Sequence, residues 1–219
     1  MSLQQQLAEY KAEFLRTAPA ERAALYEAKV AELEASFPIG KAAAAGDSAP
    51  DFTLPDAHGA PVSLAGLLAK GAVVATFYRG GWCPYCNIQL RAYQAILPEM
   101  TALGATLVAI SPQAPDGSLS TAEKNALSFP VLSDLGNRAA RAFGLVYALP
   151  QELRDALTSA GKALPGVNGD QSWELPVPAT FVIGRDGRIA LAHIDIDYRK
   201  RLEPDAILAA LRSLAAKAA

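Results

Sequence analysis

The sequence is poor in metal-binding side chains and has no long hydrophobic segment. Its 219 residues include two cysteines and two histidines. A structural zinc site needs about four ligands, and His58 and His193 lack the paired spacing of such sites, so we expect no metal. No apolar run approaches the roughly 18 residues that span a membrane, and residues 1–6 show neither the basic nor the apolar region of a secretory signal. We therefore expect a cytoplasmic protein without membrane attachment.

The sequence also lacks an excess of charge of either sign. Its 20 Lys and Arg residues oppose 22 Asp and Glu residues, for a formal net charge of −2. Without an overall positive field there is little to attract phosphates, so nucleic acid is not an expected partner. Hydrophobic residues make up 51% and charged residues 19% of the chain, which is typical of a globular protein rather than a disordered one.

The first 45 residues predict two amphipathic helices. Apolar side chains recur there at spacings of three and four, first at Leu3, Leu7, Tyr10 and Phe14, then at Tyr26, Val30, Leu33 and Phe37. The alanine-rich segment 41–48 has no periodicity, so we expect a helical extension over 1–45 and the main domain over 46–219. The apolar stripe could dock on its own chain or pair two copies as a homodimer, and we favour docking within the chain.

The main domain predicts an α/β fold. Two continuously apolar runs, 72–78 and 106–110, are typical of strands covered on both faces, and a helix over 85–103 connects them, kinked or divided at Pro98. This arrangement favours a parallel crossover. The remaining pattern predicts a strand pair at 52–64, helices near 120–127, 137–143, 151–157 and 204–214, a strand at 130–132, a surface insertion over 145–176, and a β-hairpin over 178–194.

Both cysteines lie between the first of these strands and the helix that follows it, at Cys83 and Cys86. The free N–H groups and the dipole of a helix N-terminus favour a thiolate over a thiol. A spacing of three lets the sulfurs reach bonding distance, so that one can attack a substrate and the other resolve the product as a disulfide. Arg79 could add a positive charge beside the thiolate or point into solvent. This pattern predicts a thiol–disulfide redox site that needs no cofactor, and it disfavours inert cysteines or a structural disulfide.

The cysteine motif resembles that of the thioredoxin-fold superfamily. The resemblance rests on Trp82-Cys83-Pro84-Tyr85-Cys86 after a strand and on Val177-Pro178-Ala179-Thr180-Phe181 much later. Within that superfamily the chain is similar to the peroxiredoxin-like alkyl hydroperoxide reductase and thiol-specific antioxidant (AhpC/TSA) group, on segments 49–54, 77–90, 129–134, 143–144 and 178–189. The resemblance spans residues 47–215. It implies a thioredoxin-like fold with a central mixed β-sheet flanked by helices, an antioxidant thiol–disulfide oxidoreductase, and a thioredoxin or glutathione system as reductant.

The resemblance leaves open which sulfur attacks first. In the preferred match, to thioredoxins, Cys83 is the solvent-facing attacker of a protein or small-molecule disulfide or a sulfenate, Cys86 resolves, and Pro178 follows a cis peptide bond beside the pair. Pro178 could instead be an ordinary proline at the start of a strand. In the match to peroxiredoxins, Cys86 reduces a hydroperoxide and Cys83 resolves. In that match Arg79 and Cys83 replace a proline and a threonine of the family pattern, and Pro178 stands where the family has an arginine.

Two further groups of residues have several interpretations. Trp82 and Tyr85 flank the sulfurs and could form a contact surface for a substrate or simply pack. Asp195, Asp197, Tyr198 and Arg199 follow the last predicted strand, and no task is assigned to them. A non-catalytic protein that keeps the fold for binding is the alternative from another functional class.

Overall fold

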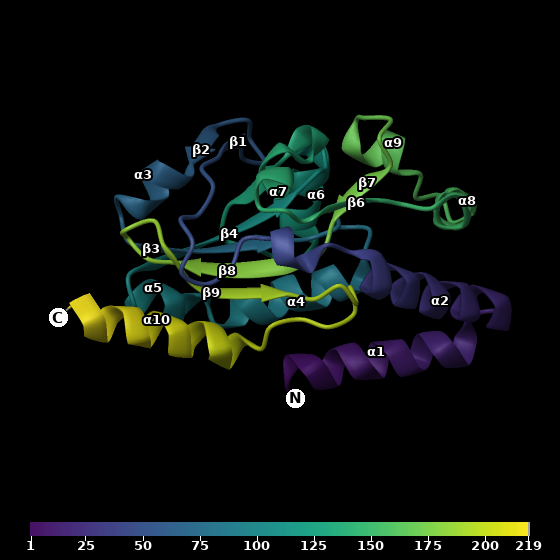
Figure 1. The fold of residues 1–219 in the computed structure, drawn as a ribbon, viewed down its shortest axis with the longest axis horizontal. Coiled ribbons are helices and arrows are strands. Elements are labelled where there is room, and N and C mark those ends of the chain that lie inside the picture. Colours follow the sequence, from purple (N-terminus) through teal and green to yellow (C-terminus); the bar gives the residue numbers. More distant parts are fainter. Residues whose placement is uncertain (219) are drawn as a thin grey trace.

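A five-stranded mixed β-sheet forms the centre of the molecule (Figure 1). The computed structural model describes residues 1–218. The strands lie in the order β5-β4-β3-β8-β9, with β3 parallel to β4, β4 parallel to β5, and β8 antiparallel to both β3 and β9. Their bounds are β3 (Ala72–Phe77), β4 (Ala105–Ser111), β5 (Val131–Ser133), β8 (Ala179–Ile183) and β9 (Ile189–Ile194). The predicted central mixed sheet, with its parallel crossover and its C-terminal hairpin, is confirmed.

Helices cover both faces of this sheet (Figure 1). On one face lie α4 (Pro84–Ala95), α5 (Leu97–Ala102) and α10 (Pro204–Ala218), and on the other lie α3 (Leu64–Leu68) and α7 (Arg138–Ala142). Successive strand side chains point to opposite faces, so Val74 joins the core on the α4 side while Val73 and Ala75 join the core on the α3 side. The strand must therefore be apolar throughout. No helix in the described part of the chain has the length and apolar character to cross a bilayer.

Proline residues set two of the helix boundaries. The predicted helix over 85–103 is divided, because α4 ends at Ala95 and Pro98 occupies the first turn of α5. A proline inside a continuous helix would remove a hydrogen bond and clash with the preceding turn. The helix predicted near 120–127 is α6 (Pro115–Lys124), which begins five residues earlier than expected. Proline is favoured in a first turn because its missing N–H would have no partner there, so the helix can begin at Pro115.

The segment 145–176 contains more structure than the predicted surface insertion. It holds an antiparallel pair, β6 (Val146–Ala148) and β7 (Glu174–Pro176), and two helices, α8 (Gln151–Ser159) and α9 (Leu164–Asn168). A small core of its own forms from Leu149, Leu157, Leu164 and Leu175. The remaining short elements are the antiparallel pair β1 (Thr53–Pro55) and β2 (Pro61–Ser63), and the 3₁₀ turns η1 (Ile39–Lys41) and η2 (Leu135–Asn137).

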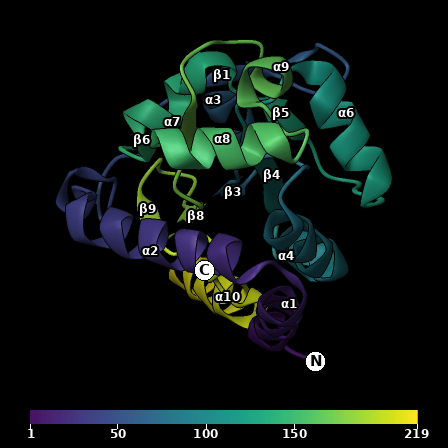
Figure 2. The ribbon, with the colours of Figure 1, turned by 90° about the vertical axis from the view of Figure 1, so that its right-hand side faces the viewer.

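The N-terminal residues form two helices, α1 (Leu3–Thr17) and α2 (Ala20–Ser36). Helix α1 packs on α4 of its own chain, and Leu3 and Leu7, each 2% exposed, belong to the same core as α4 and α10. Glu203 accepts a hydrogen bond from the backbone N–H of Gln4 at 2.8 Å. Figure 2 shows α2 beside α8 at the end of the molecule to which α4 also contributes. The division into units 1–45 and 46–219 and the homodimer stay predictions.

The peptide bond before Pro178 is trans, so the predicted cis bond is wrong. No cis peptide bond occurs within residues 1–218. The backbone N–H of Val177 donates to Leu145 at 2.8 Å, and the carbonyl of Pro178 accepts from Asp195 at 3.3 Å, which holds the segment extended between β7 and β8. The trans form is also intrinsically favoured by about 0.5–1 kcal/mol before proline. Pro178 is the ordinary proline directly before a strand.

Candidate active site around Cys83 and Cys86

The two cysteines lie on a short loop at the carboxyl end of β3. Cys83 is the N-cap residue of α4, and Cys86 lies in the first turn of that helix. Two side chains fix the loop at Gly81. Oε1 of Gln113 accepts a hydrogen bond from the N–H of Gly81 at 2.7 Å, and Nδ2 of Asn87 donates one to the Gly81 carbonyl at 2.8 Å. The elements on either side therefore hold the loop rigidly at the carboxyl edge of the parallel strands.

Two glycines allow this loop to pack so closely. Gly80 has a φ of +138°, and a Cβ added there would lie 2.4 Å from Nε1 of Trp82. A Cβ on Gly81 would lie 2.2 Å from Oγ1 of Thr121. Neither position has room for a side chain, and only glycine adopts the backbone conformation at position 80 readily.

Both cysteines are free thiols and both are buried, with Cys83 1% and Cys86 0% exposed. The expectation that Cys83 faces solvent is wrong. Tyr85 packs edge-on against Tyr10 of α1 and against Tyr198, with ring centroids 5.0 and 5.6 Å apart. The cover over the sulfurs thus comes from the N-terminal helix and from the segment after β9, two parts of the chain that lie far from the motif in sequence.

Arg79 lies beside Cys83. Its Nη1 is 4.0 Å from Cys83 Sγ, and its guanidinium lies between the rings of Trp82 and Tyr198, 5.0 and 4.0 Å from their centroids. The side chain is buried, and within residues 1–218 no carboxylate forms an ion pair with it. Its Nε has no hydrogen-bond partner in that part of the chain. Arg79 is a desolvated positive charge with donor capacity to spare.

Arg201 lies beside Cys86, with Nη2 3.5 Å from Cys86 Sγ. Its Nε donates to Oε1 of Gln89 at 2.7 Å, and its Nη1 donates to the carbonyls of Tyr198 and Lys200. Gln89 in turn donates to the hydroxyl of Thr76 on β3 at 3.2 Å. A chain of hydrogen bonds from the central strand therefore positions this guanidinium at the second sulfur.

The sequence analysis did not identify Arg201, although a signal was present. Strand β9 is antiparallel to β8, and β8 is antiparallel to β3, so β9 runs parallel to β3 and ends at the same edge of the sheet. Residues directly after β9 are thereby brought to the loop after β3. Tyr198 and Arg201 arrive at the cysteines in this way, and Arg201 supplies a second guanidinium beside the pair.

The surroundings shift the pKa values of the two thiols in opposite directions. Burial by itself raises the pKa of Cys83, but the thiol of Cys86, which donates a hydrogen bond to it, and the charges of Arg79 and then Arg201 lower that pKa well below its ordinary value. The backbone N–H of Cys86, in the first turn of α4, also lowers the pKa of Cys83. Burial and the neighbouring Cys83 raise the pKa of Cys86 well above its ordinary value, against the effect of Arg201. These shifts favour the thiolate on Cys83 and the thiol on Cys86.

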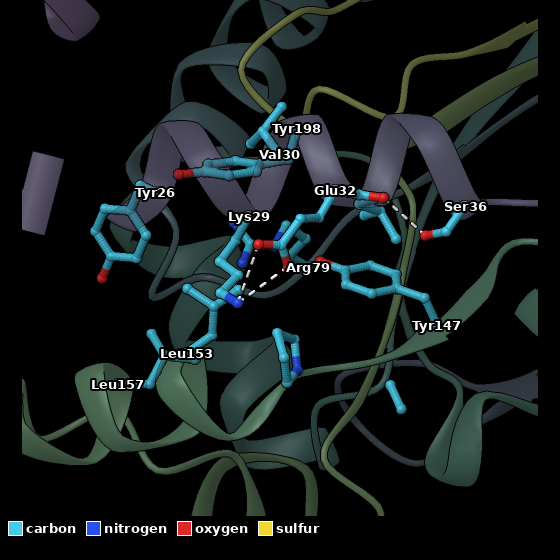
Figure 3. Close-up of a pocket in the computed structure, with 13 residues that line it drawn as sticks. Tyr26, Lys29, Val30, Glu32, Ser36, Arg79, Tyr147, Leu153, Leu157 and Tyr198 are labelled. Carbon is cyan, nitrogen blue, oxygen red and sulfur yellow. Dashed lines mark hydrogen bonds and ion pairs between the residues drawn. The ribbon is translucent and has the colours of Figure 1, made fainter. Parts of the chain in front are cut away.

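Cys83 opens onto a cavity of about 120 Å³, which Trp82, Pro84, Tyr85 and Tyr10 also line. A second cavity, of about 210 Å³, adjoins it between α2 and α8. Figure 3 shows side chains of α2 facing Leu153 and Leu157 of α8 across this second cavity, with Tyr147 at one side. Arg79, Tyr198, Tyr26 and Leu157 line both cavities, whereas Cys86 lines neither.

Most of the residues predicted for the site come together here. Cys83, Cys86, Arg79 and Trp82 form one cluster, to which the structure adds Tyr147, Tyr198 and Arg201. Pro178 lines neither cavity.

Comparison with known proteins gives a consistent family signal. A profile described as "AhpC/TSA family" matches residues 45–192. Rv2521 of Mycobacterium tuberculosis, named as a candidate peroxiredoxin, is 33% identical over 151 residues, which cover 69% of this chain and 85% of that protein. Peroxiredoxin Bcp of Escherichia coli is 28% identical over 164 residues, 75% of this chain and 92% of that one. Among solved structures, peroxidoxin BcpB of Mycobacterium tuberculosis superposes with a TM-score of 0.62 at 26% identity, over 78% of this chain and 98% of that chain. Helices α1 and α2 precede the matched profile.

Proposed function

This chain belongs to the AhpC/TSA family and is a thiol-dependent peroxidase oxidoreductase, and we propose that Cys83 is its attacking cysteine and Cys86 its resolving cysteine. The observation that carries the assignment is that Cys83, and not Cys86, lines the cavity of about 120 Å³, and Cys83 is also the sulfur with the lowered pKa. The thiolate is the nucleophile in such chemistry, so accessibility and charge favour the same residue.

In the first step, the Cys83 thiolate attacks the terminal oxygen of a hydroperoxide. The O–O bond breaks, the leaving oxygen takes up a proton to give an alcohol or water, and Cys83 becomes a sulfenic acid. Arg79, 4.0 Å from the sulfur and without a carboxylate partner among residues 1–218, can donate to the peroxide oxygens. Trp82 and Tyr198 hold the guanidinium between their rings.

In the second step, Cys86 attacks the sulfur of the sulfenic acid, and water leaves as the disulfide forms. The charge of Cys83 is one reason why the pKa of Cys86 is raised, and that charge disappears when Cys83 becomes a neutral sulfenic acid. Arg201, 3.5 Å away, then favours the Cys86 thiolate without opposition from its neighbour. Oxidation of Cys83 thereby favours the Cys86 thiolate that the second step needs.

The opposite assignment, with Cys86 reducing the peroxide, would need the substrate to pass Cys83. Cys86 is fully buried and lines neither cavity, and burial together with its neighbour disfavours its thiolate. A thiol reductant must return the disulfide to the dithiol, and we assign the protein to the cytoplasm, where thiols are kept reduced.

Sulfenic acid trapping tests the assignment. Cys83→Ser and Cys86→Ser are each treated with an equimolar amount of hydrogen peroxide in the presence of a dimedone probe, and the labelled residue is identified by mass spectrometry. The proposal expects labelled Cys83 in Cys86→Ser and no label in Cys83→Ser. A label on Cys86 in Cys83→Ser, with none in the other variant, reverses the roles.

A further inference from the structure

The cover over the two sulfurs is part of the hydrophobic core. Helix α1, which carries Tyr10, is anchored by Leu3 and Leu7, both buried in the core that α4 and α10 share. Its N-terminus is tied to Glu203, which accepts hydrogen bonds from the backbone N–H groups of Leu3 and Gln4. A cover that is anchored in this way is not a loose loop that a protein partner could displace at little cost.

Helix α2 is fixed to the same side of the site by charge. Glu27 forms ion pairs with Lys11 of α1 and with Arg199, and Arg199 also pairs with Asp197. These contacts join both N-terminal helices to the segment after β9. A reductant therefore meets Cys83 through the cavity of about 120 Å³ rather than at an exposed surface.

The charge in this cavity favours one kind of ligand. Three cations line it, Arg79, Lys162 and Arg199, and among residues 1–218 no carboxylate does. Glu27 and Asp197 neutralise Arg199 from outside the cavity, so Arg79 and Lys162 supply the positive potential within it. A small anion is attracted to such a site, and a carboxylate could accept a hydrogen bond from the Nε of Arg79, which has no partner among residues 1–218.

Taking the roles of Cys83 and Cys86 proposed above, we propose that this cavity binds the reductant, and that the reductant is a low-molecular-weight thiol bearing a carboxylate rather than a thioredoxin-type protein. A protein donor would have to bring its own sulfur into line with a disulfide that lies under Tyr10 and Tyr198, whereas a small thiol fits the cavity.

The chemistry balances with two molecules of this thiol. The first thiolate attacks Cys83 Sγ, the Cys83–Cys86 bond breaks, and its electron pair goes to Cys86, which Arg201 stabilises as the leaving thiolate before it takes up a proton. The second thiolate attacks the outer sulfur of the mixed disulfide and releases the Cys83 thiolate. The small thiol leaves as its own disulfide, oxidised by two electrons, and the protein returns to the dithiol.

The test compares three thiols of similar size and different charge, 3-mercaptopropionate, 2-mercaptoethanol and cysteamine, with a bacterial thioredoxin. The full-length disulfide protein is prepared with diamide, so that reduction is measured independently of the peroxide reaction, and rates are normalised to the thiolate concentration. We expect 3-mercaptopropionate to react about tenfold faster than cysteamine at low ionic strength, with the difference falling as salt is added. We also expect thioredoxin to react no faster than 3-mercaptopropionate.

A charge-reversal pair provides the matched control. Lys162→Glu should remove most of the preference for the carboxylate thiol, because Lys162 lines the cavity. Lys70→Glu makes the same change before β3, at the opposite edge of the sheet from Cys83, and should leave the preference unchanged.

Each part of the proposal can be overturned separately. A thioredoxin rate above that of 3-mercaptopropionate overturns the small-thiol reductant. Equal thiolate-normalised rates for the three thiols, or equal effects of the two lysine variants, overturn the carboxylate class. Failure of peroxide to oxidise Cys83 would contradict the proposed roles instead, and that outcome is read from the trapping experiment.

Discussion

At the scale of single residues, each sulfur has its own guanidinium group. Arg79 lies against Cys83 and Arg201 against Cys86, and both arginines are buried. Arg79 arrives with the cysteine loop, while Arg201 arrives from the segment after β9 and is oriented by Gln89. The two charges have different tasks in the proposed reaction, since Arg79 meets the peroxide and Arg201 prepares the resolving sulfur.

Arg201→Met should slow disulfide formation more than sulfenic acid formation. Loss of the positive charge raises the pKa of both thiols, and Cys86 loses the guanidinium that lies against its sulfur, so a shift of one pKa unit would slow its step about tenfold at neutral pH. Rapid-mixing kinetics with peroxide separates the two steps, and the slow step should recover at higher pH. Arg201→Lys should restore much of the rate, and Arg212→Met on the exposed face of α10 serves as the control. Equal slowing of both steps without recovery at high pH would indicate a purely structural role.

At the scale of elements, the cysteine loop depends on its two glycines, and Gly80 is the more restricted because of its positive φ. Gly80→Ala should lower both the peroxidase rate and the melting temperature, since the new Cβ would meet the Trp82 ring that supports Arg79. Gly40→Ala is the matched control, because a Cβ there meets nothing within 4 Å. Thermal unfolding and steady-state peroxide reduction measure the two effects. Equal behaviour of the two variants would show that the loop tolerates a side chain.

Helix α1 is a structural part of the domain to which it docks. Leu7→Ala should destabilise the protein by about 2–4 kcal/mol, the usual cost of removing a buried leucine side chain. Leu15→Ala on the same helix changes a residue that is 44% exposed and should cost far less. Denaturant unfolding gives both free energies. A Leu7→Ala protein as stable as Leu15→Ala would mean that α1 does not contribute to the core.

The sequence was informative about elements whose signals are local. The apolar runs of β3 and β4 predicted strands buried on both faces, and Pro98 predicted a break in the helix. The position of the cysteines directly after a strand predicted that they lie at a helix N-terminus. The cover over Cys83 has no local signal, because Tyr10, Tyr85 and Tyr198 meet only when the whole sheet and α1 have formed. The trans bond at Pro178 likewise depends on partners at Leu145 and Asp195.

At the scale of the whole molecule, residues near both ends of the chain surround the cysteine pair, which lies near the middle of the sequence. The family profile begins at residue 45, yet Tyr10 and Tyr26 line the cavity of Cys83, and Tyr198 and Arg199 lie beyond the profile's end at residue 192. The part of the chain that the profile matches supplies the cysteines, and residues outside it supply Tyr10, Tyr26, Tyr198 and the guanidinium of Arg201.

The central claim is that the reduced pair carries its negative charge on Cys83, and ultraviolet absorbance of the thiolate measures this most directly as pH is lowered. A lowered pKa keeps the thiolate as the pH falls below the ordinary cysteine value of 9.0, until the pH passes the pKa in the folded protein. We predict this low-pH thiolate in the wild type and in Cys86→Ser, where a hydroxyl replaces the hydrogen-bond donor, and its loss in Cys83→Ser. A thiolate that persists at low pH in Cys83→Ser and is absent from Cys86→Ser would contradict the account.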